Sequence, residues 1–274
     1  MRSAEPTDWV AIRAVIARDL VAIRRQKAVI IPMLLVPLLM LVALPATIGL
    51  AASARRDALD IGEFLSSMPD ELARPILDQP VREQAVILIM QYLLAPMFLV
   101  VPLMVSAVLA SDAFAGEKER HTLESLLHLP ISDRDLYLAK LLSAYVPTLA
   151  ISWGGFVAFT VVANASAWPV MGRLFLPTRL WMVMILWVAP GVAALGLGIM
   201  VRVSARANSS QEANQLGGTV ILPLVILLVA QTTGLLLAGI TAAAIAGAVV
   251  WVVAVVMNVQ GSRRFTREAV AAKL

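Results

Sequence analysis

The stretch DAFAGEKERHTLESLLHLPISDRDLYLAK, residues 112–140, is a charged segment between two long apolar runs. It holds ten charged side chains: Asp112, Glu117, Lys118, Glu119, Arg120, Glu124, Asp133, Arg134, Asp135 and Lys140. Its leucines gather between two charged groups, which is typical of a short amphipathic helix at a membrane surface. Pro130 is expected to end that helix. Ser132, followed by Asp135, predicts the start of another helix, because a hydroxyl caps an N-terminus and an acid favours its first turn.

The composition around this segment is that of an integral membrane protein. Apolar residues make up 60% of the 274 residues, charged residues make up 15%, and the mean hydropathy is +0.85. The absence of cysteine excludes disulfides, thiol catalysis and cysteine-ligated metals. The net charge of +4 suits basic cytoplasmic loops, so we expect the lipid bilayer, and no nucleic acid, as a partner.

Charge-free runs of about 20 residues are long enough to cross a hydrocarbon core of about 30 Å. Outward from the charged segment, such runs predict spans at 85–111 and 141–165, then at 28–52 and 180–201. Residues 213–262 form a charge-free run of fifty residues, which as one helix would be about 75 Å long. That run is therefore expected to cross twice, at 216–235 and 239–258. The predicted fold class is all-α, one membrane domain over residues 1–274 with six transmembrane helices.

Two segments outside the spans have their own expected structure. Residues 1–27 predict an amphipathic helix along the membrane surface, because spacings of three and four place on one face Trp9, Ile12, Ile16, Leu20 and Ile23. Arg18 and Arg25 lie on the opposite face. The polar residues 55–83 are expected to form an extracytoplasmic loop, with one or two short helices around 61–77.

The distribution of basic residues predicts the orientation of the chain. With both termini in the cytoplasm, the cytoplasmic segments hold 16 lysines and arginines, and the outer segments hold six. This bias follows the positive-inside rule. We therefore expect a multi-pass protein of the inner (plasma) membrane, with residues 112–140 facing the cytoplasm.

The sequence contains no recognisable catalytic or metal-binding motif. It lacks H-E-x-x-H, G-x-S-x-G and the P-loop pattern, and two histidines on one helix, His121 and His128, rarely make a metal site. The predicted spans hold no Asp, Glu, Lys or Arg, which argues against a proton-driven carrier but leaves sodium coupling through backbone carbonyls open. We expect a chain that is no enzyme and that binds no metal or cofactor of its own.

The uncharged polar residues inside the spans have two interpretations. The commoner one is that each bonds to a backbone carbonyl or a neighbouring helix. It applies to Gln91, Ser106, Thr148, Ser152, Asn164, Gln231, Thr232 and Thr233. The other interpretation is a substrate path along the proline-containing first and second spans and the fifth span. Its candidate residues are Gln91, Pro96, Gln231 and Thr232.

The charged segment also carries a specific motif. It consists of FAGEKER at 114–120, TLE at 122–124, LL at 126–127, PIS at 130–132 and KLL at 140–142. This motif resembles the permease signature of the type-2 ABC exporter family, except that His121 and Ala139 stand where glycines are usual. SSQEA at 209–213 and RFTRE at 264–268 agree with the same family. In detail, the chain resembles most the sodium-efflux-pump-like permeases.

The resemblance implies that two permeases, identical or similar, form the membrane core, and that each docks on a separate ATPase subunit. ATP and magnesium would bind to those two ATPase subunits. It also implies an elbow helix before the first span, here residues 1–27, and a coupling helix between spans two and three. The coupling residues would be Glu117, Glu119, Arg120, Thr122, Leu123, Glu124, Leu126 and Leu127. A possible second cytoplasmic contact would be Gln211 and Glu212.

These observations favour the permease subunit of an ATP-driven exporter of sodium, a drug, a peptide or a lipid-like substrate. The longest hydrophilic stretch has about 30 residues, fewer than the roughly 50 of a folded domain, so we expect ATP to be hydrolysed on another chain. The alternatives are a channel or secondary transporter without an ATPase, and a membrane anchor subunit that transports nothing. Co-purification of an ATP-binding protein would distinguish these possibilities.

Overall fold

The computed structural model of the chain describes residues 7–54, 61–66, 70–119, 131–204, 211–213 and 240–264. The regular structure within these ranges is helical, with no strand. Five helices are long and apolar enough to cross a membrane: 33–54, 81–116, 133–171, 179–204 and 240–263. The predicted all-α membrane fold is confirmed at this level. The predicted span at 216–235 lies outside the described residues.

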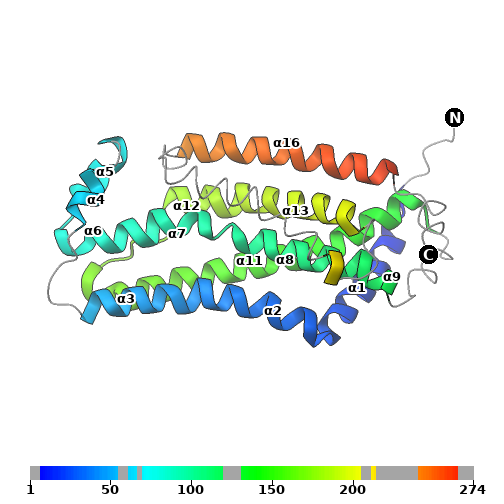
Figure 1. The fold of residues 1–274 in the computed structure, drawn as a ribbon, viewed down its shortest axis with the longest axis horizontal. Helices are drawn as coiled ribbons and strands as arrows, with labels where there is room; N and C mark the ends of the chain where they lie inside the picture. Colours follow the sequence, from blue (N-terminus) through cyan, green and yellow to red (C-terminus); the bar gives the residue numbers. More distant parts are fainter. Residues whose placement is uncertain are drawn as a thin grey trace.

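The helices form an elongated bundle (Figure 1). Helix α1 (Trp9–Arg25) and the short α9 (Glu117–Glu119) lie at one end, named here the α1 end. Helices α4 (Gly62–Ser66) and α5 (Asp70–Leu77) lie at the opposite end, where the sequence predicted one or two short helices.

Most crossings are built from several helical segments in succession. The first consists of α2 (Lys27–Leu38), η1 (Leu39–Ala43) and α3 (Leu44–Ala54). The second consists of α6 (Val81–Ile87), η2 (Leu88–Leu93), α7 (Leu94–Met97), α8 (Val100–Ser111) and η3 (Asp112–Gly116). The third is the single helix α11 (Asp133–Met171). The fourth consists of α12 (Arg179–Val183), η4 (Met184–Val188) and α13 (Ala189–Ser204). The last described crossing is the single helix α16 (Ile240–Arg264).

Prolines account for three of the four π-helical segments named above. A proline has no N–H for the carbonyl four residues earlier, and its ring crowds that carbonyl. Each of these three segments contains a residue four positions before a proline: η1 before Pro45, η2 before Pro96 and η4 before Pro190. The helix widens at these points and continues. The first crossing, which contains Pro32, Pro37 and Pro45, is helical from Lys27 to Ala54.

Helices α13 and α16 run side by side in the same direction (Figure 1). Trp187 Nε1 donates to the carbonyl of Ala244 at 3.1 Å near their starts, and Arg202 Nη2 donates to the carbonyl of Met257 at 2.9 Å near their ends. Both helices therefore end at the α1 end, so α13 ends and α16 begins at opposite ends of the bundle (Figure 1).

Helix α11 is longer than the predicted span 141–165. Its 39 residues make a helix of about 58 Å, nearly twice the hydrocarbon core. Ser132 caps its start, because its Oγ accepts the N–H of Asp135 at 3.1 Å, as the sequence predicted. The first turns of α11 therefore extend beyond the apolar run toward the α1 end.

Helix α1 packs against those first turns of α11. The backbone is extended at Gln26 (φ −94°, ψ 90°), so the chain turns between α1 and α2. Ile12, Val15 and Ala139 form a small buried apolar contact between α1 and α11. The residues of α1 that are buried in the bundle are Ile12, Val15, Asp19 and Ile23, whereas Trp9 is 55% exposed. Part of the apolar face thus packs on the chain itself, and its position at a membrane surface stays a prediction.

Candidate functional site

Four charged side chains meet where α1, α9 and α11 come together. They are Arg18, Asp19, Glu117 and Lys140, named here the charge cluster. Lys140 Nζ lies 3.1 Å from Asp19 Oδ2 and 2.5 Å from Glu117 Oε2. Arg18 Nη1 lies 3.6 Å from Asp19 Oδ1 and 3.9 Å from Glu117 Oε1. The side chain of Lys140 is 2% exposed and that of Arg18 is 46% exposed, so the cluster reaches from the interior to the surface of the protein.

The charge cluster is electrically balanced, with two cations and two carboxylates. A buried charge is costly unless it is paired, and this pairing explains how Lys140 is accommodated inside the bundle. Burial raises the pKa of Glu117 above its usual value, and the neighbouring ammonium of Lys140 opposes this rise. Lys140 therefore favours the ionised form of Glu117.

The local sequence of each helix places these side chains on buried faces. Asp19 lies four residues after Val15 and four residues before Ile23, all of which are buried. Lys140 lies between the buried Leu136 and Ala144 at the same spacing on α11. Glu117 follows η3 directly. Unlike the other π-helical segments, η3 has no proline four residues after any of its members.

One predicted coupling residue belongs to the charge cluster. Glu117 is buried and paired within its own chain, whereas Glu119 is exposed. The remaining predicted coupling residues lie outside the described residues: Arg120, Thr122, Leu123, Glu124, Leu126 and Leu127. Gln211, of the predicted second contact, is exposed and Glu212 is half-buried, in the short gold segment at the α1 end (Figure 1). The coupling roles of all these residues stay predictions.

Sequence reasoning missed the pairing of Asp19 with Lys140. The signal was present: in the predicted N-terminal helix, Asp19 lies four residues from two apolar residues, Val15 and Ile23. A buried acid requires a cation. Which cation it meets depends on how α1 packs against α11, and helical spacing within one segment does not specify that.

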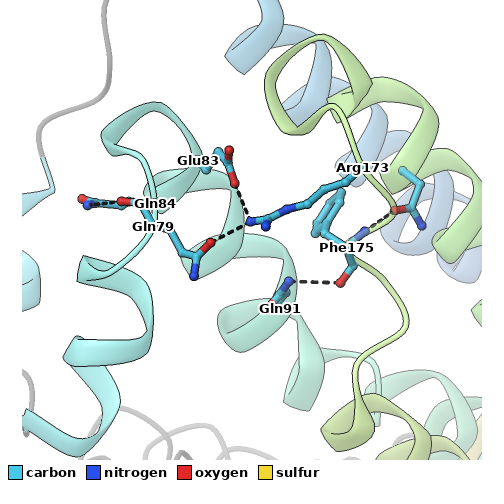
Figure 2. Close-up of polar contacts among 7 residues, drawn as sticks. Gln79, Glu83, Gln84, Gln91, Arg173 and Phe175 are labelled. Carbon is cyan, nitrogen blue, oxygen red and sulfur yellow. Dashed lines mark hydrogen bonds and ion pairs between the residues drawn. The ribbon is translucent and has the colours of Figure 1, made fainter.

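A second polar network lies at the opposite end of the bundle, around the chain between α11 and α12 (Figure 2). Arg173 Nη2 donates to Gln79 Oε1 at 2.6 Å and to Glu83 Oε2 at 2.7 Å. Gln91 Nε2 donates to the carbonyl of Phe175 at 3.1 Å. Asn164 Oδ1 accepts the N–H groups of Phe175 and Leu176 at 3.0 and 3.3 Å. This network holds residues 172–178, named here the connecting segment, against the bundle.

Hydrogen bonds within the chain account for several polar residues of the spans. Gln91 and Asn164 bond to the backbone of the connecting segment. Three hydroxyl groups donate to carbonyls three or four residues earlier: those of Ser106, Thr148 and Ser152. The commoner interpretation is thus confirmed for these five residues. Of the other substrate-path candidates, Pro96 is buried, and Gln231 and Thr232 lie outside the described residues.

The apolar crossings and the helical bundle define a multi-pass membrane protein. A family model described as ABC-2 family transporter protein matches residues 13–259. The chain belongs to this family, whose members are components of membrane transport and generally work with ATPase partners. The family expected from residues 112–140 is thereby confirmed, whereas the sodium-efflux-pump-like branch stays a prediction. A search among curated proteins finds no match to the chain.

Proposed function

We propose that this chain is the permease subunit of an ATP-driven exporter and that a separate ATPase subunit supplies the energy. Membership of the ABC-2 family carries the proposal, because its membrane proteins generally act with ATPase partners. Residues 112–140, which carry the family signature, form the contact with the ATPase subunit. Leu123, Leu126 and Leu127 anchor it in a groove of the ATPase, and charged residues such as Glu119, Arg120 and Glu124 set its register.

The directions of the described helices support six spans. Helix α13 ends and α16 begins at opposite ends of the bundle, so a crossing at 216–235 fits between them. Helix α1 and the end of α16 both lie at the α1 end, which fits an even number of crossings. With 16 of the 22 lysines and arginines in the segments assigned to that side, the α1 end is cytoplasmic in the inner membrane. Residues 1–27 then form the elbow helix.

The exporter that we propose contains two permeases, identical or homologous, and two ATPase subunits that hold ATP and magnesium. The substrate is sodium, a drug, a peptide or a lipid-like molecule. Its path follows the first, second and fifth spans at the interface between the permeases, past Pro96, Gln231 and Thr232. Gln91 is the fourth residue that we propose for this path, and its side chain donates to the carbonyl of Phe175.

The test is a double variant of the signature, Glu124→Gln with Leu127→Ala. Because hot-spot residues each contribute at least about 2 kcal/mol, we expect ATP-driven transport in proteoliposomes to fall about tenfold or more. The matched control makes the same two changes at exposed positions of the opposite end, Glu63→Gln with Leu77→Ala. Unchanged transport together with unchanged assembly of the complex would refute the coupling role of residues 117–127.

A further inference from the structure

Helix α1 is fastened to α11 at three successive positions. The N–H of Asp8 donates to Asp135 Oδ2 at 3.3 Å. Ile12 and Val15 pack on Ala139. Asp19 pairs with Lys140 at 3.1 Å. Contacts at a backbone amide, an apolar patch and an ion pair fix both the position of α1 and its rotation about its own axis.

The charge cluster extends this attachment to a third element. The ammonium of Lys140 is shared between a carboxylate of α1, that of Asp19, and a carboxylate of α9, that of Glu117. Arg18 contacts the same two carboxylates from the surface side. Helix α9 begins where the second crossing ends, contains the predicted coupling residues Glu117 and Glu119, and precedes the others in the chain. Lys140 therefore joins α1, the end of the second crossing and the start of the third.

We propose that the charge cluster makes α1, α9 and the first turns of α11 one mechanical body, with Asp19 and Lys140 as positioning residues for energy coupling. The part that concerns coupling rests on the proposed function. Separating buried opposite charges leaves each uncompensated in a medium of low dielectric constant. The three elements consequently move together when one of them is pushed.

This arrangement defines which crossings a displacement of α9 reaches. Helix α1 continues through Gln26 into α2, so it carries the first crossing. Helix α9 continues the second crossing, and Lys140 belongs to the third. A push on residues beyond Glu119 is thus delivered to three crossings at once. If α1 were not attached to the charge cluster, the same push would reach only the second and third crossings.

Asp19→Asn tests the proposal with little threat to the fold. It removes the carboxylate of α1 and leaves the pair of Lys140 and Glu117 charge-balanced. Arg18→Gln combined with Asp19→Asn removes both charges that α1 contributes. Arg13→Gln, at an exposed position of the same helix, is the matched control. Because the chain has no cysteine, Ala17→Cys and Glu119→Cys give clean spin-label sites on exposed residues of α1 and α9.

The distance between the two labels is measured by double electron–electron resonance on the permease alone, in vesicles of phosphatidylcholine and phosphatidylglycerol. We expect one narrow distribution for the parent and for the Arg13→Gln control, and a clearly broader one for both cluster variants. In unlabelled protein with the ATPase that co-purifies, transport per ATP hydrolysed should fall about fivefold or more in the cluster variants.

Three results would overturn the mechanical connection, and a fourth would overturn the proposed function alone. Narrow distributions in the cluster variants would overturn the proposal, as would unchanged transport per ATP. Loss of the folded protein in Asp19→Asn, measured by thermal unfolding, would also overturn it, because the cluster would then serve only the fold. If the parent shows no ATP-driven transport while the label distances behave as expected, the proposed function fails and the mechanical connection stands.

Discussion

Lys140→Met is expected to lower the free energy of unfolding by about 3–5 kcal/mol, because it removes the buried cation that two buried carboxylates share and leaves them only the exposed Arg18. Methionine fills a similar volume, so the loss reports the charge and not a cavity. Reversible unfolding in detergent micelles measures the change. A cation replaced by methionine at an exposed position, Arg74→Met, is the control, and it is expected to change stability by at most about 0.5 kcal/mol.

A companion variant separates an uncompensated charge from a general loss of packing. Asp19→Asn, Glu117→Gln and Lys140→Met together remove all three buried charges. Replacing a whole buried ion cluster by neutral groups is often close to neutral, so most of the stability lost in Lys140→Met should return. Equal stability of Lys140→Met and the parent protein would show that Lys140 does not compensate the two carboxylates.

Gly49→Ala is expected to destabilise the contact between the first and third crossings by about 1–3 kcal/mol. A Cβ at Gly49 would lie 2.6 Å from Ser166 Cβ and 2.9 Å from the backbone carbonyl carbon of Ser166, so α3 and α11 would have to separate. Ser53 Oγ donates to the carbonyl of Ser166 at 3.0 Å across the same contact, and this bond would lengthen. The measurement is again the unfolding free energy.

Gly154→Ala, on α11, is the matched control for this second substitution. No heavy atom lies within 4 Å of a Cβ at Gly154, so the added methyl group meets open space. Alanine favours a helix over glycine by up to about 1 kcal/mol, and we expect no loss of stability. Equal losses in the two glycine variants would contradict the close contact between α3 and α11.

The sequence predicted the apolar crossings well because a charge-free run of sufficient length has few alternatives to a membrane span. The start of α11 was predicted from the cap at Ser132, but the predicted span began only at residue 141. Asp133, Asp135 and Lys140 are charged, so hydropathy excludes them from a span, yet they continue the same helix. Their charges are compatible with the helix because Lys140 is paired and Asp135 lies in the first turn, where the helix dipole favours an acid.

The candidate site was predicted only in part. The motif at 112–140 identified Glu117 through family resemblance, but gave no sign that its side chain faces inward, toward Lys140. That contact joins residues 23 positions apart, and its second partner, Asp19, lies on a helix nearly one hundred residues earlier in the chain. Spacing rules within one helix reach three or four residues, so they do not predict such pairs. The same limit applies to Gln91, whose partner carbonyl belongs to Phe175.

The central claim is that this ABC-2 family protein is a permease driven by the ATPase of another subunit. The most direct measurement is to purify the chain in a mild detergent from its own membranes, identify what co-purifies and assay ATP hydrolysis. We predict an ATP-binding subunit in equal number to the permease, with hydrolysis that drives transport after reconstitution. Transport by the purified chain in vesicles that contain no ATP-binding protein would contradict the claim.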